Sequence, residues 1–543
     1  MKILVMCKPY LIKYIWGLVT YLSISLIAGI FMIINPFIIG SFIDALVDGG
    51  TMNDIFVFSM IFACISIVRI IFNFITMILY TKIQTKSAHE FSQDAVAHLQ
   101  KLPLSFFNKK DTDYISQVIN GDTNMLTIFC INIGHSFILN GIYFIIPLSI
   151  LFFLNSTITL ILLSFIAIYA IIYLKFRKPL FERSMGHRIV QNQFFSKLLE
   201  QLKLTKFIKI HELSNTFRKR MDNYFFKLIG ETLKMQKLNF AYASLDTFVN
   251  TIAQIVLFLL GGYFVLTGNF TVGMFTMFTM YFNMMIGSAK FFFDFGKKYQ
   301  DNLVSYSRIQ EILSSPIESN GRIKLTDIEC IEVKNLCFSY TDSEHMKSIR
   351  NLNYKLKKGN IYGVKGHNGA GKSTLINLLL GMHIDEIHGD ILINNQSIRN
   401  LDMHDIRKKH VGVAEQNPVI LNDTLEYNTK LEIVTTDSCT NKSTTIEKYF
   451  KMLNMEKHFS SGADSDNKDV LVFSGGEKQK LCILRLLLKN PFVMIFDEPT
   501  SSLDSKTVSQ FITYLNEIKG DKIIIIVTHD NLIYQICDYV LSL

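Results

Sequence analysis

The sequence predicts a membrane protein in two parts: an all-α transmembrane domain of six helices, followed by an α/β domain built around a phosphate-binding loop (P-loop). Three observations support this fold class. The 543-residue chain is 49% hydrophobic and only 19% charged, with a mean hydropathy of +0.27, which is too apolar for an ordinary soluble protein of this length. Its long apolar runs all lie in the first half. A glycine-rich loop between an apolar strand and a helix lies in the second half.

The apolar runs define the predicted membrane spans. A helix needs about 20 apolar residues to cross the hydrocarbon core of a bilayer. Six runs are of this order, near residues 15–40, 56–80, 128–153, 157–174, 247–266 and 273–295. We therefore expect a transmembrane domain over residues 1–308, a polar linker over 309–325 and the α/β domain over 326–543.

Positive charge is distributed unevenly between the segments that join these spans. Residues 82–127 carry five Lys or Arg and residues 175–242 carry fifteen, whereas 41–54, 154–156 and 267–272 carry none. The positive-inside rule predicts a multi-pass protein of the cell membrane, with both termini and the α/β domain in the cytoplasm. The net charge of +9 is then mainly a topology signal. Because aromatic residues do not interleave with the basic ones, no nucleic acid partner is expected.

Both basic segments are far longer than a turn requires. Leu99–Asp122 and Leu198–Met221 mix helical apolar periodicity with basic residues. We expect the spans to continue into the cytoplasm as helices that carry short connecting segments able to dock on a soluble domain. Two solvated basic loops are the alternative, although unstructured loops of this length are uncommon.

The P-loop is the stretch Gly366–Thr374. It fits the pattern G-x-x-x-x-G-K-[ST], and it follows the strand-like run Ile361–Val364 and precedes the helix-forming run Thr374–Leu380. Backbone N–H groups, the positive end of the helix and the Lys372 ammonium suit a polyphosphate, while the Ser373 hydroxyl suits Mg²⁺. An α/β P-loop nucleotide-binding domain is therefore predicted.

Two further strands end in residues that suit phosphoryl chemistry. The run Phe492–Phe496 ends in Asp497, placed to hold the Mg²⁺ shell, and Glu498, placed to polarise the attacking water. The run Lys522–Val527 leads to His529, which can contact the terminal phosphate. Strand ends that merely meet solvent, and a satisfied polar histidine, are the alternatives.

A second anion-binding helix start lies at Phe473–Glu477 (Phe-Ser-Gly-Gly-Glu), before the predicted helix Lys478–Lys489. One nucleotide does not need two such sites. We therefore expect this segment to complete the phosphate site of a second chain, so that ATP is bound between two copies.

The second half resembles the nucleotide-binding domain of an ATP-binding cassette (ABC) transporter, and six spans followed by one cassette are similar to the half-transporters of the exporter class. The resemblance implies ATP and Mg²⁺ as cofactors, and a homodimer or a closely related heterodimer as the assembly. It implies Glu498, His529 and Gln416 as catalytic residues, with Ser373, Gln416 and Asp497 around Mg²⁺. The implied ATP-binding residues are Tyr340, Gly366, His367, Asn368, Gly369, Ala370, Gly371, Lys372, Ser373, Thr374 and Asp497. The segment acting on the partner's nucleotide is Phe473, Ser474, Gly475, Gly476 and Glu477, and the contact with the partner cassette is Ser501, Ser502, Leu503 and Asp504.

The chain departs from the family pattern at several points. Phe473 and Glu477 replace the usual Leu and Gln, which we expect to be near-neutral for phosphate contact because Ser474 and the backbone make it. Residues 466–470 lack the Gly-Glu pattern through which many exporters touch the partner, which puts that coupling contact in doubt. The first span begins near residue 15, so no peptidase is expected before it, and another protein would remove any leader from a peptide cargo.

A polar stripe marks a candidate cargo cavity. Asp246, Asn250 and Gln254 are spaced i, i+4 and i+8 in the fifth span and so share one helix face. Polar groups at bilayer depth usually face a cavity or a partner group. Hydrogen bonding between helices is an equally good explanation. Arg69 of the second span has three candidate partners: Asp246, an acidic lipid and an acidic cargo.

Together these features predict an ATPase coupled to transport: an exporter that moves an amphiphilic molecule from the cytoplasm or the inner leaflet outward by alternating access. A small secreted peptide is the first candidate for the cargo, by analogy with the family. A multidrug or lipid exporter (flippase) is the alternative. An ATP-gated channel and a non-transporting sensor are further alternatives on the same scaffold.

Overall fold

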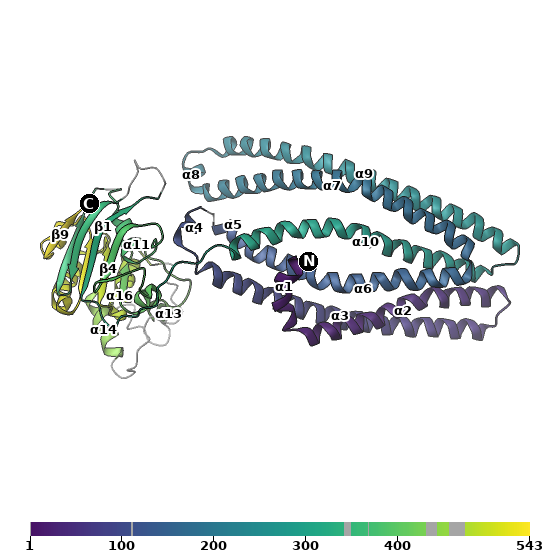
Figure 1. Ribbon diagram of the computed structural model, residues 1–543, viewed down its shortest axis with the longest axis horizontal. Coiled ribbons are helices and arrows are strands. Elements are labelled where there is room, and N and C mark those ends of the chain that lie inside the picture. The colour runs from purple at the N-terminus through teal and green to yellow at the C-terminus, as the bar shows by residue number, and fades with distance from the viewer. Residues whose placement is uncertain (1, 110–111, 341–348, 368, 431–441, 456–472) are drawn as a thin grey trace. The chain divides into compact units, whose positions relative to one another are not determined.

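The computed structural model describes residues 2–109, 112–340, 349–367, 369–430, 442–455 and 473–543 (Figure 1). Contacts between residues divide the chain into two units. The first, the helical unit, comprises Met1–Gln100 and Thr112–Ser315, and the second, the α/β unit, comprises Lys101–Asp111 and Pro316–Leu543. Each unit is described by itself.

The helical unit is built from long helices because a chain in lipid must satisfy its backbone hydrogen bonds within each segment. The principal helices are α1 (Lys2–Ile12), α2 (Ile15–Val47), α3 (Met52–Leu99), α6 (Thr123–Leu154), α7 (Ser156–Lys203), α9 (Ser214–Leu266) and α10 (Val272–Leu313). Within the described residues, five stretches are long and apolar enough to cross a membrane: Ile15–Val47, Met52–Leu99, Ile115–Leu154, Ser156–Lys203 and Ser214–Leu266. The sixth expected span, 273–295, lies within α10. A helical transmembrane domain followed by an α/β domain is confirmed.

Several helices extend well beyond their apolar runs. Helices α3 and α7 have 48 residues each and α9 has 53, so they continue past the predicted spans as expected. The joining segments also contain short helical elements. These are α4 (Leu104–Lys109), α5 (Thr112–Gln117), the π-helical turn η1 (Val118–Asp122) and α8 (Thr205–Ile210). Two unstructured basic loops are therefore excluded.

A partly buried ion pair joins the π-helical turn to the end of α10. Asp122 accepts hydrogen bonds of 2.8 Å from both Ser305 and Arg308, and its side chain is 6% exposed. Because α10 leads into the α/β unit, this pair links the base of α6 to the connection between the two units.

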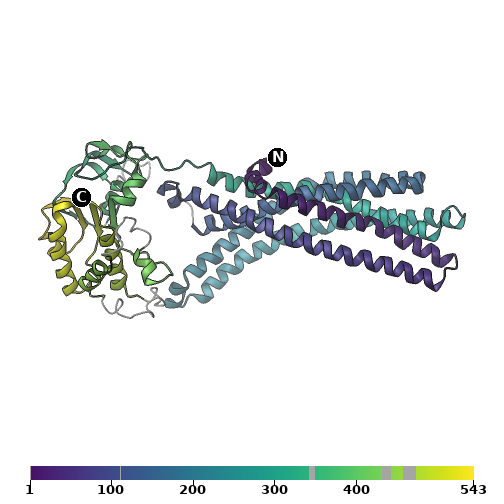
Figure 2. The same ribbon diagram turned by 90° about the horizontal axis from the view of Figure 1, so that it is seen from below.

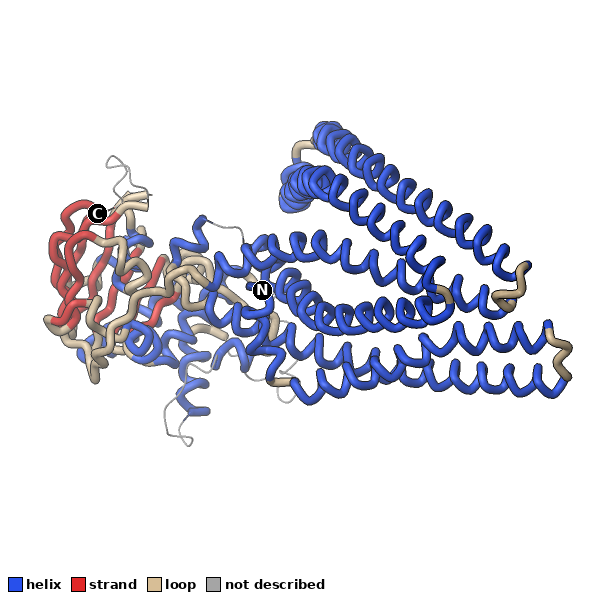
Figure 3. The backbone as a smooth tube through the Cα atoms, turned by 45° about the vertical axis from the view of Figure 1, so that its right-hand side comes forward, coloured by secondary structure: helices blue, strands red, loops and turns tan. Residues whose placement is uncertain are grey.

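Helices α7 and α9 form a hairpin that packs mainly on itself (Figure 1). Toward α8 the hairpin diverges from α6 and α10, as Figures 2 and 3 show from two other directions. Its diverging part carries exposed apolar side chains: Phe195, Leu199, Leu202, Phe207, Ile210, Phe226 and Leu233. This surface is left without a partner among the described helices of the unit.

Small residues let α2 and α10 approach closely. A Cβ atom added to Gly273 would lie 2.0 Å from the Gly40 carbonyl oxygen and 2.5 Å from the Asp44 carboxylate. Asp44 in turn accepts hydrogen bonds from the Gly273 N–H (2.6 Å) and the Thr271 hydroxyl (2.7 Å) at the start of α10. The Asp44 carboxylate of α2 thus caps the positive N-terminal end of α10.

The α/β unit contains two sheets. The antiparallel sheet has the order β2-β1-β4-β5 and the parallel sheet the order β6-β7-β8-β3-β9. The strands are β1 (Cys330–Phe338), β2 (Ile349–Lys357), β3 (Asn360–Lys365), β4 (His388–Ile393), β5 (Gln396–Ser397), β6 (Val411–Ala414), β7 (Val493–Asp497), β8 (Ile523–Val527) and β9 (Tyr539–Ser542). The helices are α11 (Lys372–Leu379), α12 (Met403–Lys409), α13 (Leu425–Lys430), α14 (Lys442–Met452), α16 (Gly475–Lys489), α17 (Ser505–Ile518) and α18 (Asn531–Tyr534), with a 3₁₀ turn at Lys519–Asp521.

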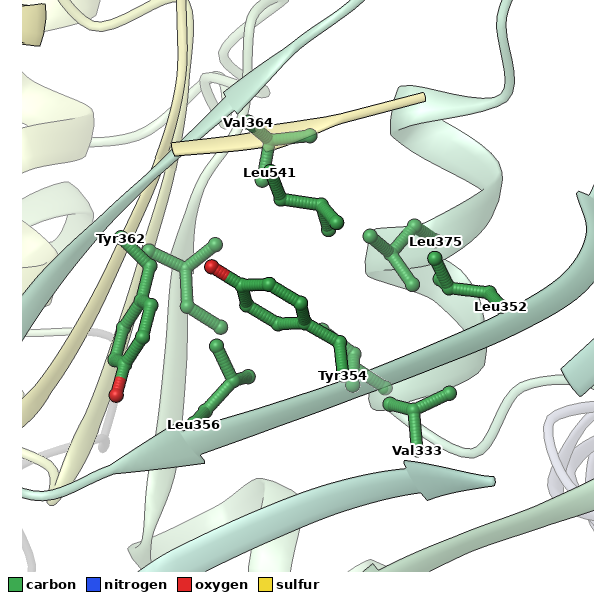
Figure 4. A pocket seen from close by; sticks show the side chains of 10 residues that line it. Val333, Leu352, Tyr354, Leu356, Tyr362, Val364, Leu375 and Leu541 are labelled. Carbon is green, nitrogen blue, oxygen red and sulfur yellow. The ribbon is translucent and has the colours of Figure 1, made fainter. Parts of the chain in front are cut away.

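The parallel strands read as continuous apolar runs because both of their faces are covered. All five residues of β8, Ile523–Val527, are buried. One apolar core lies toward the antiparallel sheet and α11, and the other lies against α16 and α17. Figure 4 shows where the two sheets meet, with Tyr354 of β2 among Tyr362, Val364 and Leu541; the apolar gap there is only about 10 Å³. That gap is a feature of core packing and is too small for a ligand.

We expect Gly273→Ala to lower the thermal unfolding temperature of the purified protein, because the added methyl group meets backbone and carboxylate atoms that cannot move freely. A cost of about 1–3 kcal/mol is typical of such overpacking. Gly287→Ala in the same helix is the matched control, since its Cβ would meet nothing within 4 Å. Equal unfolding temperatures for the two variants would contradict the close contact between α2 and α10.

Candidate nucleotide-binding site

The P-loop joins β3 to α11 at the carboxyl edge of the parallel sheet. Gly369 and Gly371 adopt positive φ angles of 84° and 96°, which side chains with a Cβ rarely tolerate, and Gly371 is the N-cap of α11. The Lys372 ammonium donates a 2.7 Å hydrogen bond to the Gly366 carbonyl and lies 2.8 Å from His529 Nε2. The loop thus directs a cation and a helix N-terminus toward the same edge.

Asp497 ends β7 beside this loop, and Glu498 follows it directly. Burial raises the pKa of the Asp497 carboxyl, the Glu498 charge adds to that rise, and a hydrogen bond from Ser373 opposes it. Glu498 has a positive φ angle of 49°, its N–H donates to the Val527 carbonyl (2.8 Å), and its Oε1 lies 3.6 Å from His529 Nε2. The backbone therefore turns sharply at the residue expected to act on water.

A cavity of about 620 Å³ lies over these strand ends. It brings together most of the residues predicted for the nucleotide. Its lining is Tyr340, Gly369, Gly371, Lys372, Ser373, Thr374, Gln416, Asp497, Glu498, Ser501 and His529. Gly366, His367 and Ala370 belong to the loop but not to this lining, and Asn368 lies outside the described residues.

Tyr340 lies at the edge of the cavity with 50% of its surface exposed. Its hydroxyl is 3.3 Å from Thr374 Oγ1, and its ring meets those of Phe338 and His383 edge to face. The exposed ring face suits stacking on a nucleotide base.

The signature segment, Phe473–Glu477, starts α16 and is not part of this lining. Ser474 is the N-cap: its Oγ accepts a 3.3 Å hydrogen bond from the Glu477 N–H. The Ser474 N–H and hydroxyl both donate to Glu477 Oε2 at 2.7 Å. Glu477 thus completes a capping box that orders the start of α16. The family signature usually has Gln at this position, and the substitution alone does not reveal this capping role.

The contact segment, Ser501–Asp504, lies beside both the nucleotide cavity and the start of α16. Ser501 lines the cavity, although the sequence pattern associates it with a partner cassette, and Ser502 places its carbonyl against Gly476, where an added Cβ would lie 2.6 Å away. Leu503 packs on the core beneath. Asp504 caps α17, accepting from Thr507, and pairs with Lys480 of α16 at 3.0 Å. Residues 466–470, where the family pattern is missing, lie outside the described residues.

The cargo stripe, Asp246, Asn250 and Gln254, faces α10 at two of its positions. Asp246 pairs with Lys290 at 2.8 Å rather than with Arg69, and Gln254 Nε2 lies 3.5 Å from Asn283 Oδ1. Asn250 Oδ1 is buried without a hydrogen-bond partner among the described residues. Lys290 is not among the predicted site residues, although a lysine within the apolar run 273–295 is a visible signal in the sequence. Helix packing decided the pairing, because α10 is the helix that meets α9 at Asp246 and Gln254.

Two known protein families match this chain, one in each half. Residues 18–289 match the family "ABC transporter transmembrane region", and residues 349–501 match the family "ABC transporter". The chain belongs to the ABC transporter family. The expected half-transporter organisation is confirmed, and the protein is an ATPase coupled to transport, with ATP as its nucleotide.

Relatives of this transporter include several named for export. It is 24% identical over 532 residues to the leukotoxin export ATP-binding protein LtxB of Aggregatibacter actinomycetemcomitans, covering 96% of this chain and 73% of the relative. It is 25% identical over 515 residues to the multidrug resistance-like ATP-binding protein MdlB of Buchnera aphidicola, covering 92% and 85%. A bacterial Atm1-family ABC exporter with ATP bound shares its fold, with a TM-score of 0.83, 18% identity and coverage of 98% and 94%.

Proposed function

We propose that this transporter is an exporter that works as a pair of chains, two copies or two closely related half-transporters, and moves an amphiphilic cargo outward by alternating access. The observation that carries this proposal is the separation of two anion-binding helix starts within one chain. The N-terminus of α11 faces the nucleotide cavity, whereas the ordered N-terminus of α16 is not in that cavity's lining.

A nucleotide bound at the P-loop of one chain would leave one side of its phosphates uncovered. Ser474, Gly475 and Gly476 of a second chain offer N–H groups and a helix dipole for that side. Ser501 extends the lining of the cavity toward the contact segment, which suits a site closed by a partner. The two cassettes would then approach when nucleotide is bound and separate after hydrolysis.

Within each site the residues have distinct proposed roles. Lys372 and the P-loop amides hold the phosphates, Tyr340 stacks on the base, and His529 contacts the terminal phosphate from its position beside Lys372. Glu498 polarises the attacking water. His367, Asn368 and Ala370 contribute to the loop.

The residues near Asp497 fit Mg²⁺. Burial disfavours the charged form of Asp497, and a bound cation would reverse that effect, since a hard cation prefers the oxygen ligands that Ser373, Gln416 and Asp497 offer. Mg²⁺ would neutralise charge on the phosphates there. All three side chains line one cavity, so no rearrangement of strands is required.

The helical unit also favours a second chain. In the 18-residue apolar part of each stretch, at most 33% is buried within the chain, so the remaining surface needs lipid or protein. Lipid can cover the spans themselves. The exposed apolar residues of the α7–α9 hairpin near α8, however, lie in the Lys- and Arg-rich segment beyond the apolar runs, where lipid is not expected to reach them. The helical unit of a second copy is the proposed cover for them. We place this basic segment, both termini and the cassette in the cytoplasm, in accordance with the positive-inside rule.

For the cargo, we propose that the stripe on α9 lines part of the cavity that opens inward. The Asn250 oxygen has no hydrogen-bond partner among the described residues, and Asp246 pairs with Lys290. Polar groups within a bilayer are costly unless they meet a partner group or a cavity. A small secreted peptide is the first candidate, in keeping with a relative named for leukotoxin export, and a drug or lipid is the alternative, in keeping with a relative named for multidrug resistance. Cargo would enter from the cytoplasm or the inner leaflet.

We expect Glu498→Gln to lower the ATPase rate by about 10²–10⁴-fold while ATP still binds, because the variant keeps the shape of the side chain but removes the base. Steady-state ATPase and equilibrium ATP binding by the purified protein measure the two effects. Uphill transport should stop with hydrolysis. Cargo flux that continues in Glu498→Gln would favour an ATP-gated channel.

A complementation experiment tests the shared site. Lys372→Ala and Ser474→Tyr are placed either on opposite chains of a doubly tagged pair or together on one chain, in a Glu498→Gln background. If sites are shared, the opposite arrangement leaves one intact site and retains one nucleotide per pair, whereas the combined arrangement leaves none. Sites formed within single chains predict the reverse pattern, so retained ATP distinguishes the two.

We expect Asp246→Asn combined with Asn250→Ala to weaken stimulation of the ATPase by a short hydrophobic peptide. Loss of one or two buried polar contacts at about 1–3 kcal/mol each would raise the half-saturating peptide concentration tenfold or more. Thr251→Ala is the matched control, because Thr251 is exposed on the same helix and bonds only its own backbone, at Thr247. Unchanged stimulation in the double variant would remove the stripe from the cargo path.

A further inference from the structure

A second cavity, of about 250 Å³, lies far along the chain from the cassette residues, where the junction of α1 and α2 meets α3. It combines basic, aromatic and apolar side chains. Its lining is Lys13, Tyr14, Trp16, Gly17, Leu79, Lys82, Ile83 and Lys86. Neither the family match nor the nucleotide chemistry accounts for this combination.

The base of the cavity is apolar and closely packed. Ile83 is 5% exposed and belongs to a small core with Tyr21 and Ile131, against which Tyr14 and Leu79 pack. Gly17 leaves room beside it, since an added Cβ would already lie 3.2 Å from Ile83 Cδ1. A ligand with an apolar part can therefore contact the base without displacing a side chain.

The rim is positively charged. Lys82 and Lys86 are four residues apart on α3 and so share one helix face, and neither has an ion pair among the residues that the structure describes. Lys13 is different: it pairs with Glu90 at 2.9 Å, and Tyr14 donates a 2.6 Å hydrogen bond to the same carboxylate. Asp94 also acts on Lys13 at longer range. Glu90 thus offsets one lysine and leaves two cationic charges for an anion.

The position of the cavity matches a membrane surface. The apolar run of α2 begins near residue 15 and that of α3 ends near residue 80, so the lysines follow directly on lipid-embedded segments. Trp16 is 82% exposed, as aromatic residues at the boundary between hydrocarbon and water commonly are. Basic pockets between helices at this level recognise anionic lipid headgroups.

We propose that this cavity binds an anionic phospholipid, with Lys82 and Lys86 on the phosphate of the headgroup, Tyr14 at its polar edge, and Trp16, Leu79 and Ile83 along the first part of an acyl chain. Free inorganic phosphate shares the anion but offers nothing to the apolar half of the lining. This site is independent of the proposed export function.

The test uses the full-length protein in detergent, with binding of phosphatidylglycerol and phosphatidylcholine of identical acyl chains followed by native mass spectrometry. We expect wild-type protein to prefer phosphatidylglycerol, and Lys82→Ala with Lys86→Ala to lower that affinity by about tenfold or more, with little effect on phosphatidylcholine. Lys175→Ala with Lys178→Ala is the matched control, because these lysines follow the fourth apolar run but line no part of the cavity.

Gly17→Leu provides a second variant that keeps every charge and fills the space beside Ile83. It should also lower phosphatidylglycerol affinity, which separates a shaped site from general surface charge. The thermal unfolding temperature of each variant, compared with that of the wild-type protein, verifies the fold of the helical unit. Equal affinity for the two lipids, an equal loss in the Lys175 and Lys178 control, or binding of inorganic phosphate as tight as that of phosphatidylglycerol would overturn the proposal.

Discussion

The candidate nucleotide site depends on the register of three parallel strands. Val527 of β8 pairs with Val364 of β3 on one side and with Asp497 of β7 on the other. Because parallel strands end at the same edge, this register brings the P-loop, the two carboxylates and His529 to one level. The apolar run of β8 is buried on both faces and so anchors this edge of the sheet in the core.

The helical unit meets a different constraint, because lipid cannot satisfy backbone groups and helices must therefore continue unbroken through it. Specific contacts then occur at small residues and at a few polar ones. Gly273 lets α10 approach α2, Asp44 caps the resulting helix start, and Asp122 holds Arg308 near the other end of α10. Helix α10 is thus fixed at both ends, which suits the helix that leads toward the cassette.

Much of the fold and of the candidate site could be predicted from residues that are consecutive in the sequence. The P-loop, the Asp497–Glu498 pair and the serine before α16 each carry their chemistry within a few positions, so local patterns were sufficient. Predictions that required a partner from another helix were less successful. The candidate partner Arg69 is not the one that Asp246 contacts, and Lys290 takes that place. A helical wheel shows which face of a helix is polar but not which helix covers that face. The motif comparison predicts Glu477 to be a near-neutral substitute for Gln, whereas the structure shows its carboxylate accepting two hydrogen bonds from Ser474.

The sequence by itself determined that apolar runs form membrane helices, that a glycine loop suited to phosphate follows an apolar strand, and that the two parts belong to one ABC transporter chain. Hydropathy and short motifs depend on neighbouring residues, so no tertiary contact was needed for these conclusions. Only the tertiary structure decided that Ser501 lines the nucleotide cavity, that Lys290 neutralises Asp246, and that residues near Lys13 and near Lys86 enclose a basic cavity. The physical reason is that strand register and helix packing join residues separated by tens to hundreds of positions, and no local pattern records those contacts.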